Sequence, residues 1–413
     1  MTALLAEFRD ALLLDGRRTP FVDYRKAFVM VSPIDLGIKA ARGAIAALGV
    51  DPAEIGTTIA GSMAQASFDA YVTPRHIGLY AGVPVDRPAH LVQRICGTGI
   101  EVLSQAADAV SLGRAELVLA VGTESMSRNP MASYTHRNPN FQGFDKGSQY
   151  RDFLWEALYD PAVKCSMGDT AENLAKQYGI TRETVDEFAS RSFARAMQNR
   201  HFLAGEILEV KDEWFEREGF ERRGVRLPRD VKAVDVDSHI RHSPVEVLAT
   251  LKPAFGGVQT AGNSSAIVDG AGAILVGTKG YARGKGITPL ARIHCAAAVG
   301  VPPEIMGIGP VRAIRAVLKA ADLTLDQIER IEINEAFGAQ TLACVRELGI
   351  DEERLNVNGG AIAIGHPLGA TGIRLALTLA RELKRARGRW GIASACIGGG
   401  QGIAMLIENE EHA

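Results

Sequence analysis

The chain has 413 residues, of which 46% are hydrophobic and 23% are charged, and this composition indicates a globular protein of two or three domains. Its 46 basic and 48 acidic residues give a formal charge of −2. We expect no nucleic-acid partner, because there is no basic excess to neutralise a phosphate backbone. The longest apolar run, near Ala271–Val276, is too short to span a membrane.

The first part of the chain alternates between helical and extended patterns. The N-terminal stretch carries acidic residues within its apolar part, so we expect no signal peptide. From about Arg9 to Glu124, short apolar runs such as Glu116–Val121 alternate with helical patterns such as Ile34–Leu48. This alternation predicts layers of helices and strands.

The middle part, from about Ser125 to Leu251, is charged and irregular. One amphipathic helix is predicted there over roughly Thr170–Phe202, with Asp169 or Thr170 as its N-cap. From about residue 260 onward the α/β alternation returns. The middle part is therefore predicted to be an insertion into one continuous layered core.

The two outer parts resemble each other at a constant offset. Ile55 aligns with Ile328, and Thr98 aligns with Thr371, so both matches are displaced by the same 273 residues. We interpret this as an internal duplication of one α/β half. In each half a Thr-Gly-Ile triplet begins a predicted helix, and two related halves would bring these helix N-termini together as a site for anions.

Cys96 is the first candidate reactive residue. It lies in Arg94-Ile-Cys-Gly-Thr-Gly, directly before a helix predicted over Ile100–Leu112, and the positive end of a helix favours a thiolate. The flanking Gly97 and Gly99 would let a substrate carbonyl approach the backbone. The alternative is a buried and unreactive cysteine, which is a common state of free cysteines.

His366 is the second candidate. Pro367 disfavours helical backbone at His366, so the imidazole is expected in a rigid loop just before a helix over Ile373–Leu383. The surrounding glycines and the symmetry with Cys96 indicate a general base. A purely structural histidine is the alternative.

Cys396 is the third candidate. It lies in a glycine-rich turn between strands predicted at Gly391–Ala395 and Ile403–Ile407. Backbone N–H groups of such a turn can bind an oxyanion beside the thiol. The alternative is a tight hairpin with a packed cysteine. The turn lacks the lysine of a phosphate-binding P-loop and does not begin a helix.

Disulfides and metal sites are not expected. Five cysteines without paired spacing predict reduced thiols in a cytosol-like compartment. The dispersed cysteines and histidines do not predict a structural zinc site. His239 and His242 are spaced as HxxH but have no clear third ligand, and we expect them to be solvated loop histidines.

Taken together, these motifs resemble the thiolase family. The chain carries four reactive motifs in the family's order: Cys96-Gly-Thr-Gly, Asn334-Glu-Ala-Phe, Gly365-His-Pro and Cys396-Ile-Gly-Gly-Gly. The resemblance extends over nearly the whole chain through five further segments: Asp15-Gly-Arg-Arg-Thr-Pro-Phe, Gly122-Thr-Glu-Ser-Met-Ser, Met167-Gly-Asp-Thr-Ala-Glu-Asn, Leu251-Lys-Pro-Ala-Phe and Ala261-Gly-Asn-Ser-Ser.

The resemblance implies the thiolase fold, an α/β fold in which two duplicated halves form a layered αβαβα core. We expect the N-terminal half over residues 1–125, completed by about 266–288. The inserted loop domain is expected over 126–265, and the C-terminal half over 289–413.

The resemblance also implies a reaction, the cleavage of a 3-oxoacyl-CoA by CoA into acyl-CoA and acetyl-CoA. Cys96 would be the nucleophile, His366 the base for Cys96 and for CoA, and Cys396 the acid and base at the α-carbon. Asn334 would hold a water that shares one oxyanion hole with His366. The backbone N–H groups of Cys96 and Gly398 would form the other.

Family contacts to CoA carry over to five residues. Ser265 would bond the pantetheine amide, Met167 and Phe337 would wall its tunnel, and Ala261 and Ala336 would complete it. CoA is a substrate, so neither a cofactor nor a metal is expected.

An arginine-rich segment offers one further set of CoA contacts. It could meet the nucleotide phosphates by charge-assisted contacts, or it could be a solvated loop. Its arginines are Arg217, Arg222, Arg223, Arg226 and Arg229.

One residue departs from the short-chain members of the family. Many biosynthetic acetoacetyl-CoA thiolases have His-Met-Gly where this chain has Ser166-Met167-Gly168, and that histidine lines the short pocket. Serine leaves more space, so we expect longer or broader acyl chains. The aromatic-rich stretch Asn129–Tyr159 is a candidate cover for the acyl pocket.

We therefore expect a 3-oxoacyl-CoA thiolase of fatty-acid β-oxidation, cytoplasmic and assembled as a homodimer or homotetramer. The main alternative is a biosynthetic acetyl-CoA acetyltransferase. A ketoacyl-synthase-like condensing enzyme fits less well, because that class lacks a second reactive cysteine such as Cys396. A non-catalytic acyl-CoA-binding protein is the alternative of a different class. A partner subunit cannot be read from the sequence.

Overall fold

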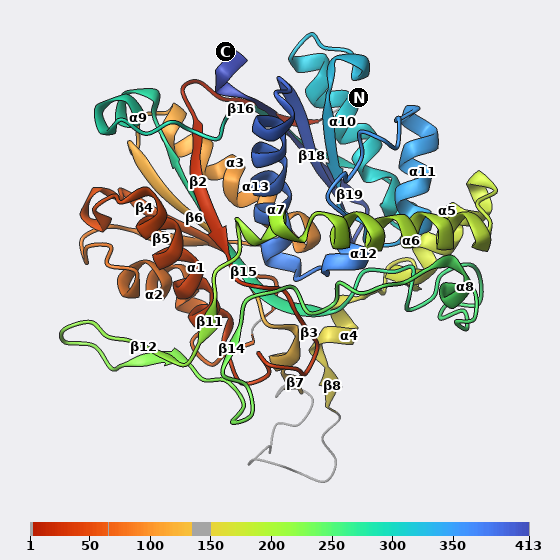
Figure 1. The fold of residues 1–413 in the computed structure, drawn as a ribbon, viewed down its shortest axis with the longest axis horizontal. Coiled ribbons are helices and arrows are strands. Elements are labelled where there is room, and N and C mark those ends of the chain that lie inside the picture. The colour runs from red at the N-terminus through yellow and green to blue at the C-terminus, as the bar shows by residue number, and fades with distance from the viewer. Residues whose placement is uncertain (1–2, 65, 134–149, 413) are drawn as a thin grey trace.

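The structure is a computed structural model, and it describes residues 3–64, 66–133 and 150–412 (Figure 1). Its central feature is an 11-stranded sheet within this part of the chain. The main path of the sheet runs in the order β17 (Arg330–Ile333), β18 (Trp390–Ile397), β19 (Gln401–Glu408), β16 (Ala291–Gly300), β2 (Leu12–Arg18), β15 (Val268–Gly277), β6 (Leu117–Glu124), β4 (Thr57–Gly61) and β5 (Ala89–Val92). Two short strands flank it, β1 (Leu4–Glu7) on β16 and β3 (Val22–Asp23) on β15.

The sheet consists of two halves that meet at a narrow join. β16 and β2 pair over only two residues, Ala291 with Leu13 and Arg292 with Leu12. Strands β2 to β6 and β15 lie on one side of this join, and β16 to β19 lie on the other. The short join lets the two halves turn their inner faces toward each other.

Helices fill the space between the halves and cover the outer faces, as Figure 1 shows. The buried side chains of the central helices pack with residues of both halves in one shared core. The central helices are α3 (Thr98–Ser111) and α13 (Leu368–Ala386), and the outer helices are α1 (Pro33–Leu48) and α2 (Thr73–Tyr80) on the first half, with α10 (Gly309–Ala320) and α11 (Gly338–Leu348) on the second. This αβαβα order confirms the predicted fold class.

The side chains of β6 alternate between two of these layers. Leu119 and Val121 pack into the outer core beneath α1, whereas Val118 and Ala120 pack into the central core. Successive side chains of a strand point to opposite faces. A strand that is buried on both faces therefore reads as one continuous apolar run.

The duplication is visible in element boundaries that sequence matching did not use. β6 (Leu117–Glu124) and β18 (Trp390–Ile397) begin and end at positions that differ by the same 273 residues. The same offset relates the 3₁₀ turns Pro52–Glu54 and Leu325–Gln327. The duplicated unit therefore includes a strand and a turn as well as the Thr-Gly-Ile triplets.

The two central helices meet at their Thr-Gly-Ile triplets. A Cβ atom added to Gly99 would lie 2.6 Å from the backbone N of Ile373, and one added to Gly372 would overlap the backbone of Ile100. The helix N-termini thus come together backbone against backbone, as the duplication predicts.

The single helix predicted over Thr170–Phe202 is wrong, because the segment forms three helices: α5 (Met167–Tyr178), α6 (Arg182–Gln198) and α7 (Arg200–Ala204). Gly179 adopts a φ of 59° and ends α5, and the Thr181 side chain caps α6. The N-cap of α5 is Ser166, not Asp169 or Thr170. Ser166 and Asp169 form a reciprocal capping box.

The remaining described elements are short. They are β7 (Met131–Ala132), β8 (Arg151–Asp152), α4 (Phe153–Ala157), β9 (Tyr159–Asp160), β10 (Cys165–Ser166), β11 (Val210–Lys211), β12 (Glu213–Phe215), β13 (Arg223–Val225), β14 (Ala233–Val234), α8 (Val245–Leu248), α9 (Lys279–Lys285) and α12 (Ala361–Ile364). None of the described helices has the length and hydrophobicity needed to cross a membrane.

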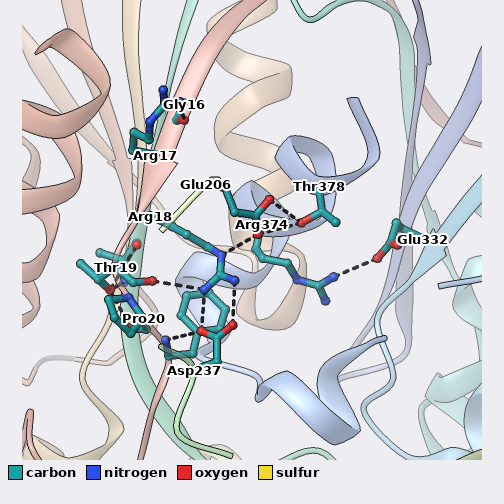
Figure 2. A network of polar contacts seen from close by, with 12 residues as sticks. Gly16, Arg17, Arg18, Thr19, Pro20, Glu206, Asp237, Glu332, Arg374 and Thr378 are labelled. Carbon is teal, nitrogen blue, oxygen red and sulfur yellow. Dashed lines mark hydrogen bonds and ion pairs between the residues drawn. The ribbon is translucent and has the colours of Figure 1, made fainter. Parts of the chain in front are cut away.

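A buried ion network connects the middle part of the chain to both halves (Figure 2). Arg18 of β2 donates two hydrogen bonds to Asp237, at 2.6 and 2.8 Å, and a third to Glu206, at 2.7 Å. Glu206 also accepts a hydrogen bond from Thr378 of α13. Arg18, Asp237 and Glu206 are almost fully buried, so their charges depend on each other for solvation.

Candidate active site

A cavity of about 700 Å³ collects most of the predicted site residues. Seven of the ten line it: Cys96, Met167, Ala261, Ser265, Ala336, Phe337 and His366. They come from both halves and from the middle part of the chain. The other three, Asn334, Cys396 and Gly398, contact lining residues, as described below.

Cys96 lies in a strained turn that is held by one threonine. The 3₁₀ turn Ile95–Gly97 leads directly into α3, and Ile95 has a φ of 45°, which β-branched residues rarely adopt. The Thr98 hydroxyl donates to the Ile95 carbonyl at 2.7 Å and accepts from the Arg94 N–H at 2.9 Å. These two bonds keep the Cys96 side chain at the cavity wall.

The Cys96 thiol is neutral in the free protein. Its pKa is raised to about 11, mainly by burial and to a smaller extent by Glu124, while the nearby backbone N–H groups of Gly398 and of Cys96 itself oppose the increase. Burial opposes the thiolate in the free protein, and the prediction that the helix N-terminus favours a thiolate stays a prediction. The same two N–H groups are those predicted for an oxyanion hole.

His366 is held as a neutral imidazole with a partner at each ring nitrogen. Its Nδ1 lies 2.6 Å from the Thr371 hydroxyl, and its Nε2 lies 3.2 Å from the Asn334 Nδ2. Burial, together with a smaller effect of the Arg374 guanidinium, lowers the pKa of His366 to about 3. The imidazole is therefore neutral in the free protein, and one of its ring nitrogens carries a lone pair.

Asn334 follows β17 and is fully buried. Its backbone N–H donates to the Ser394 carbonyl at 2.9 Å, which fixes the residue beside β18. Its Oδ1 has no hydrogen-bond partner among the described residues. A buried amide oxygen of this kind is suited to accept from a water molecule, which supports the predicted water position.

Cys396 lies at the end of β18 and is fully buried. It packs with Met167, Met306 and Ala336, which all line the cavity. Burial raises its pKa well above the ordinary value, and the nearby Cys96 adds to the increase. Cys396 is thus a protonated thiol at the edge of the site.

Sequence reasoning missed two carboxylates that hold the site together. Glu124 accepts from the N–H groups of Met63, at 2.9 Å, and of Gly369, at 2.9 Å, so it joins the first half to the start of α13. Glu124 belongs to the segment Gly122-Thr-Glu-Ser-Met-Ser. Its position as an acidic residue at the end of a fully buried apolar strand could have indicated a structural role.

Glu335 is the second of these carboxylates. It accepts from the Ser192 hydroxyl at 2.7 Å, from the Asn356 amide at 2.8 Å and from the Ile362 N–H at 3.1 Å. These contacts fasten the loop that precedes His366. Their partners lie far apart in the sequence, so no local pattern indicated them.

The arginine-rich segment contacts the protein itself. Arg223 pairs with Asp35 at 2.6 Å and with Asp69 at 2.8 Å, while Arg226 pairs with Asp212 at 3.1 Å. Arg222 and Arg226 lie over the Trp214 ring, and Arg217 donates to the backbone carbonyl of Val83 at 2.8 Å. None of the five predicted arginines, Arg229 included, is among the described residues that line the cavity. Four of the five arginines therefore have structural contacts, and their contact with the nucleotide phosphates stays a prediction.

Other cavity residues refine three predictions. His239 lines the cavity and lies 2.6 Å from the Asp23 carboxylate, so the expectation of a solvated histidine is wrong for His239, while His242 is exposed. Ser166 also lines the cavity, and its hydroxyl is occupied by the capping box. Within the stretch 129–159, Trp155, Leu158 and Tyr159 line the cavity, whereas residues 134–149 lie outside the described residues.

Comparison with known proteins identifies relatives over the full chain. Residues 11–280 match the family described as "Thiolase, N-terminal domain", and residues 287–409 match "Thiolase, C-terminal domain". The chain is 40% identical over 410 residues to the mitochondrial 3-ketoacyl-CoA thiolase of Homo sapiens, with 98% of this chain and 100% of the relative covered. It is 37% identical over 404 residues to the acetyl-CoA acetyltransferase of Paracoccus denitrificans, with 96% and 99% covered. A crystal structure of the human mitochondrial 3-ketoacyl-CoA thiolase in complex with CoA matches with a TM-score of 0.89 at 38% identity, with 99% of each chain covered.

Proposed function

Since the chain belongs to the thiolase family, we propose that it is an acyltransferase that cleaves a 3-oxoacyl-CoA with CoA to give acyl-CoA and acetyl-CoA. The observation that carries this proposal is the convergence of Cys96, His366, Asn334 and Cys396 at one apolar cavity. Relatives of this chain are named 3-ketoacyl-CoA thiolase, and one of them is known in complex with CoA.

The first half-reaction transfers the acyl group to Cys96. The Cys96 thiol gives its proton to His366 Nε2, and the sulfur attacks the 3-oxo carbon of the substrate. The bond between C2 and C3 then breaks, and its electron pair becomes the enolate of acetyl-CoA. Cys396 protonates the α-carbon, so acetyl-CoA leaves and an acyl-enzyme remains.

The second half-reaction transfers the acyl group to CoA. The proton that His366 took from Cys96 passes to the Cys396 thiolate, which restores His366 and Cys396 to the neutral state. His366 then takes the proton of the incoming CoA thiol, and the CoA sulfur attacks the acyl carbon. The Cys96 thiolate leaves and regains a proton from His366, so the enzyme returns to its starting state.

The negative charge on the substrate oxygens meets two sets of donors. The backbone N–H groups of Cys96 and Gly398 act on the Cys96 sulfur and oppose the rise of its pKa, which supports a role for them in binding an oxyanion on the carbon that the sulfur attacks. Asn334, with a water, and protonated His366 would stabilise the enolate oxygen. These roles are supported by the contacts described above.

The cavity has two apolar sides that suit the two parts of the substrate. Beside Cys96 lie Met126, Leu158, Ile267 and Leu368, and we assign this side to the acyl chain. The other side contains the five residues predicted for pantetheine, Met167, Ala261, Ser265, Ala336 and Phe337. The apolar wall next to the nucleophile supports medium-to-long acyl chains and a degradative role in β-oxidation.

Thiolysis of 3-oxoacyl-CoAs from four to sixteen carbons tests this proposal directly. We expect the highest kcat/KM for the longer substrates. Activity confined to acetoacetyl-CoA would favour the second candidate, an acetyl-CoA acetyltransferase, which is also the name of the Paracoccus relative. Absence of thiolysis at every chain length would contradict the proposal. The variant Cys96→Ala is the control that gives the background rate of thiolysis.

We further propose that the protein is a homodimer or homotetramer. β5 is the last strand on the main path of the described sheet, and its Leu91 is exposed. Phe68 and Tyr71 are also exposed, and they precede α2, which packs against β5. An apolar sheet edge of this kind suits a second copy of the chain. The molar mass from light scattering should be that of a dimer or a larger oligomer. The substitution Leu91→Lys should shift the molar mass toward that of a monomer.

The compartment and the domain boundaries stay predictions. All five cysteines are free, which supports a reducing compartment such as the cytosol, although the human relative is named as mitochondrial. The division at about residues 125, 265 and 288 is supported by the insertion of 126–265 between β6 and β15, which are paired neighbours in the sheet.

A further inference from the structure

One buried hydroxyl contacts His366 without taking part in the reaction proposed above. Thr371 lies in the first turn of α13 and is fully buried. Its Oγ1 is 2.6 Å from His366 Nδ1 and 3.1 Å from the carbonyl oxygen of Pro367. Thr371 does not line the cavity, so it reaches the substrate only through His366.

Counting protons couples the directions of these two bonds. A threonine hydroxyl has one proton to donate, and the Pro367 carbonyl can only accept. If Thr371 donates to Pro367, its oxygen must accept from His366 Nδ1–H. The imidazole then carries its single proton on Nδ1, and Nε2 presents a lone pair.

The equivalent threonine in the first half supports this arrangement. Thr98 precedes Thr371 by the 273-residue offset of the duplication. Its hydroxyl also donates to a carbonyl of the preceding turn, that of Ile95, and accepts from one N–H, that of Arg94. In both halves the hydroxyl of one threonine orients the turn that carries a reactive side chain.

We propose that Thr371 is a positioning residue that holds His366 in its Nδ1–H tautomer, so that Nε2 carries the lone pair that takes the proton of Cys96. This inference rests on the function proposed above for the role of Nε2. A hydroxyl partner orients the ring without adding a negative charge that would stabilise the imidazolium, as a carboxylate would. The buried Arg374, which opposes protonation of His366, acts in the same direction.

Ring-¹⁵N histidine NMR tests the tautomer in the complete protein, with His366→Gln identifying the signals of His366. We expect a protonated Nδ1 and an unprotonated Nε2 in the wild type. The opposite tautomer in the wild type would overturn the proposal, because Thr371 would then be the donor to Nδ1. This measurement does not depend on thiolase activity, so it separates failure of this inference from failure of the proposed function.

Two substitutions at Thr371 test the consequence for catalysis. Thr371→Val removes the hydroxyl at nearly constant volume, and we expect kcat to fall about 10- to 100-fold with little change in KM, together with a mixed tautomer. Thr371→Ser keeps the hydroxyl and should restore most of kcat.

Thr341→Val is the matched control. Thr341 is also buried and also donates to a carbonyl four residues earlier, that of Phe337, but it does not contact His366. We expect its kcat and the His366 tautomer to remain close to wild type. An unchanged tautomer in Thr371→Val, or an equal loss of kcat in Thr341→Val, would overturn the proposal.

Discussion

At the residue scale, burial controls the charge of every reactive group. The pKa of Cys96 and that of Cys396 are raised by burial, and that of His366 is lowered. The free site therefore contains two thiols and an imidazole, all neutral. Protons must therefore move between these groups during the reaction, when negative charge develops on the substrate. The backbone N–H donors of Cys96 and Gly398 would stabilise that charge.

The raised pKa of Cys96 predicts how fast the free enzyme is alkylated. Since burial raises this pKa to about 11, the rate of Cys96 modification by iodoacetamide should rise about tenfold for each pH unit between pH 7 and pH 10. His366, with a pKa lowered to about 3, should add no step near pH 6.5. Mass spectrometry of timed samples measures the rate. A plateau below pH 8 would show that Cys96 is a thiolate in the free enzyme.

Substitution of each of the two reactive cysteines should affect a different step of the reaction. Cys96→Ala should abolish both turnover and acyl-enzyme formation. Cys396→Ala should lower turnover about 10²- to 10⁴-fold, yet it should still acylate from a simple acyl-CoA, because that step needs no proton at an α-carbon. Intact-mass measurement detects the acyl-enzyme. Cys165→Ala is the control, and near-normal turnover of Cys396→Ala would contradict its assignment.

At the scale of elements, the contact between α3 and α13 depends on the absence of side chains. Gly99 and Gly372 are equivalent residues of the two halves, and each faces the backbone of the opposite triplet. Only glycine allows backbones to approach this closely. The same contact places the turn of Cys96 next to the helix that carries Thr371, so the packing of two helices aligns the two reactive loops.

Gly372→Ala should therefore destabilise the protein. The added Cβ would overlap the backbone of Ile100, which cannot move aside as a flexible side chain could. We therefore expect a loss of about 1–3 kcal/mol in the free energy of unfolding. Urea unfolding followed by circular dichroism measures it. Gly284→Ala in α9 is the control, since no atom lies within 4 Å of the added Cβ, and alanine should stabilise this helix by up to about 1 kcal/mol. Equal stabilities of the two variants would refute the packing argument.

At the scale of the whole molecule, the middle part of the chain is fastened to both halves by buried charge. Arg18 of the first half holds Asp237 and Glu206 of the middle part, and Glu206 reaches Thr378 of the second half (Figure 2). The middle part also supplies Met167, Ala261 and Ser265 to the cavity. The position of the cavity wall therefore depends on contacts between all three parts.

Arg18→Met should cost about 3–5 kcal/mol in the free energy of unfolding, because two buried carboxylates lose their partner. Thermal and urea unfolding measure the loss. Arg17→Met is the matched control from the adjacent position. Arg17 pairs with Asp15 of its own strand near the surface, at 2.9 Å, so its loss should stay below about 1 kcal/mol. Similar losses for the two variants would show that the network does not hold the parts together.

The sequence by itself determined the duplicated α/β plan and the reactive side chains. Hydrophobic periodicity and turn residues are local, and one offset of 273 residues relates Ile55 to Ile328 and Thr98 to Thr371. Cys96, His366 and Cys396 each lie in a short glycine-rich motif next to a predicted helix or strand. These features could be read without knowledge of any long-range contact.

Only the tertiary structure decided the protonation of these groups and the contacts of the residues around them. Cys96 is a neutral thiol because the fold buries it, an effect that no local pattern contains. Arg223 pairs with Asp35, which is 188 residues away, and Glu335 bonds Ser192, which is 143 residues away. Burial and ion pairing depend on which distant segments the fold brings together, whereas periodicity and turn chemistry act between neighbouring residues. The sequence therefore determines which reactive side chains are present, and the tertiary structure determines their charge and contacts.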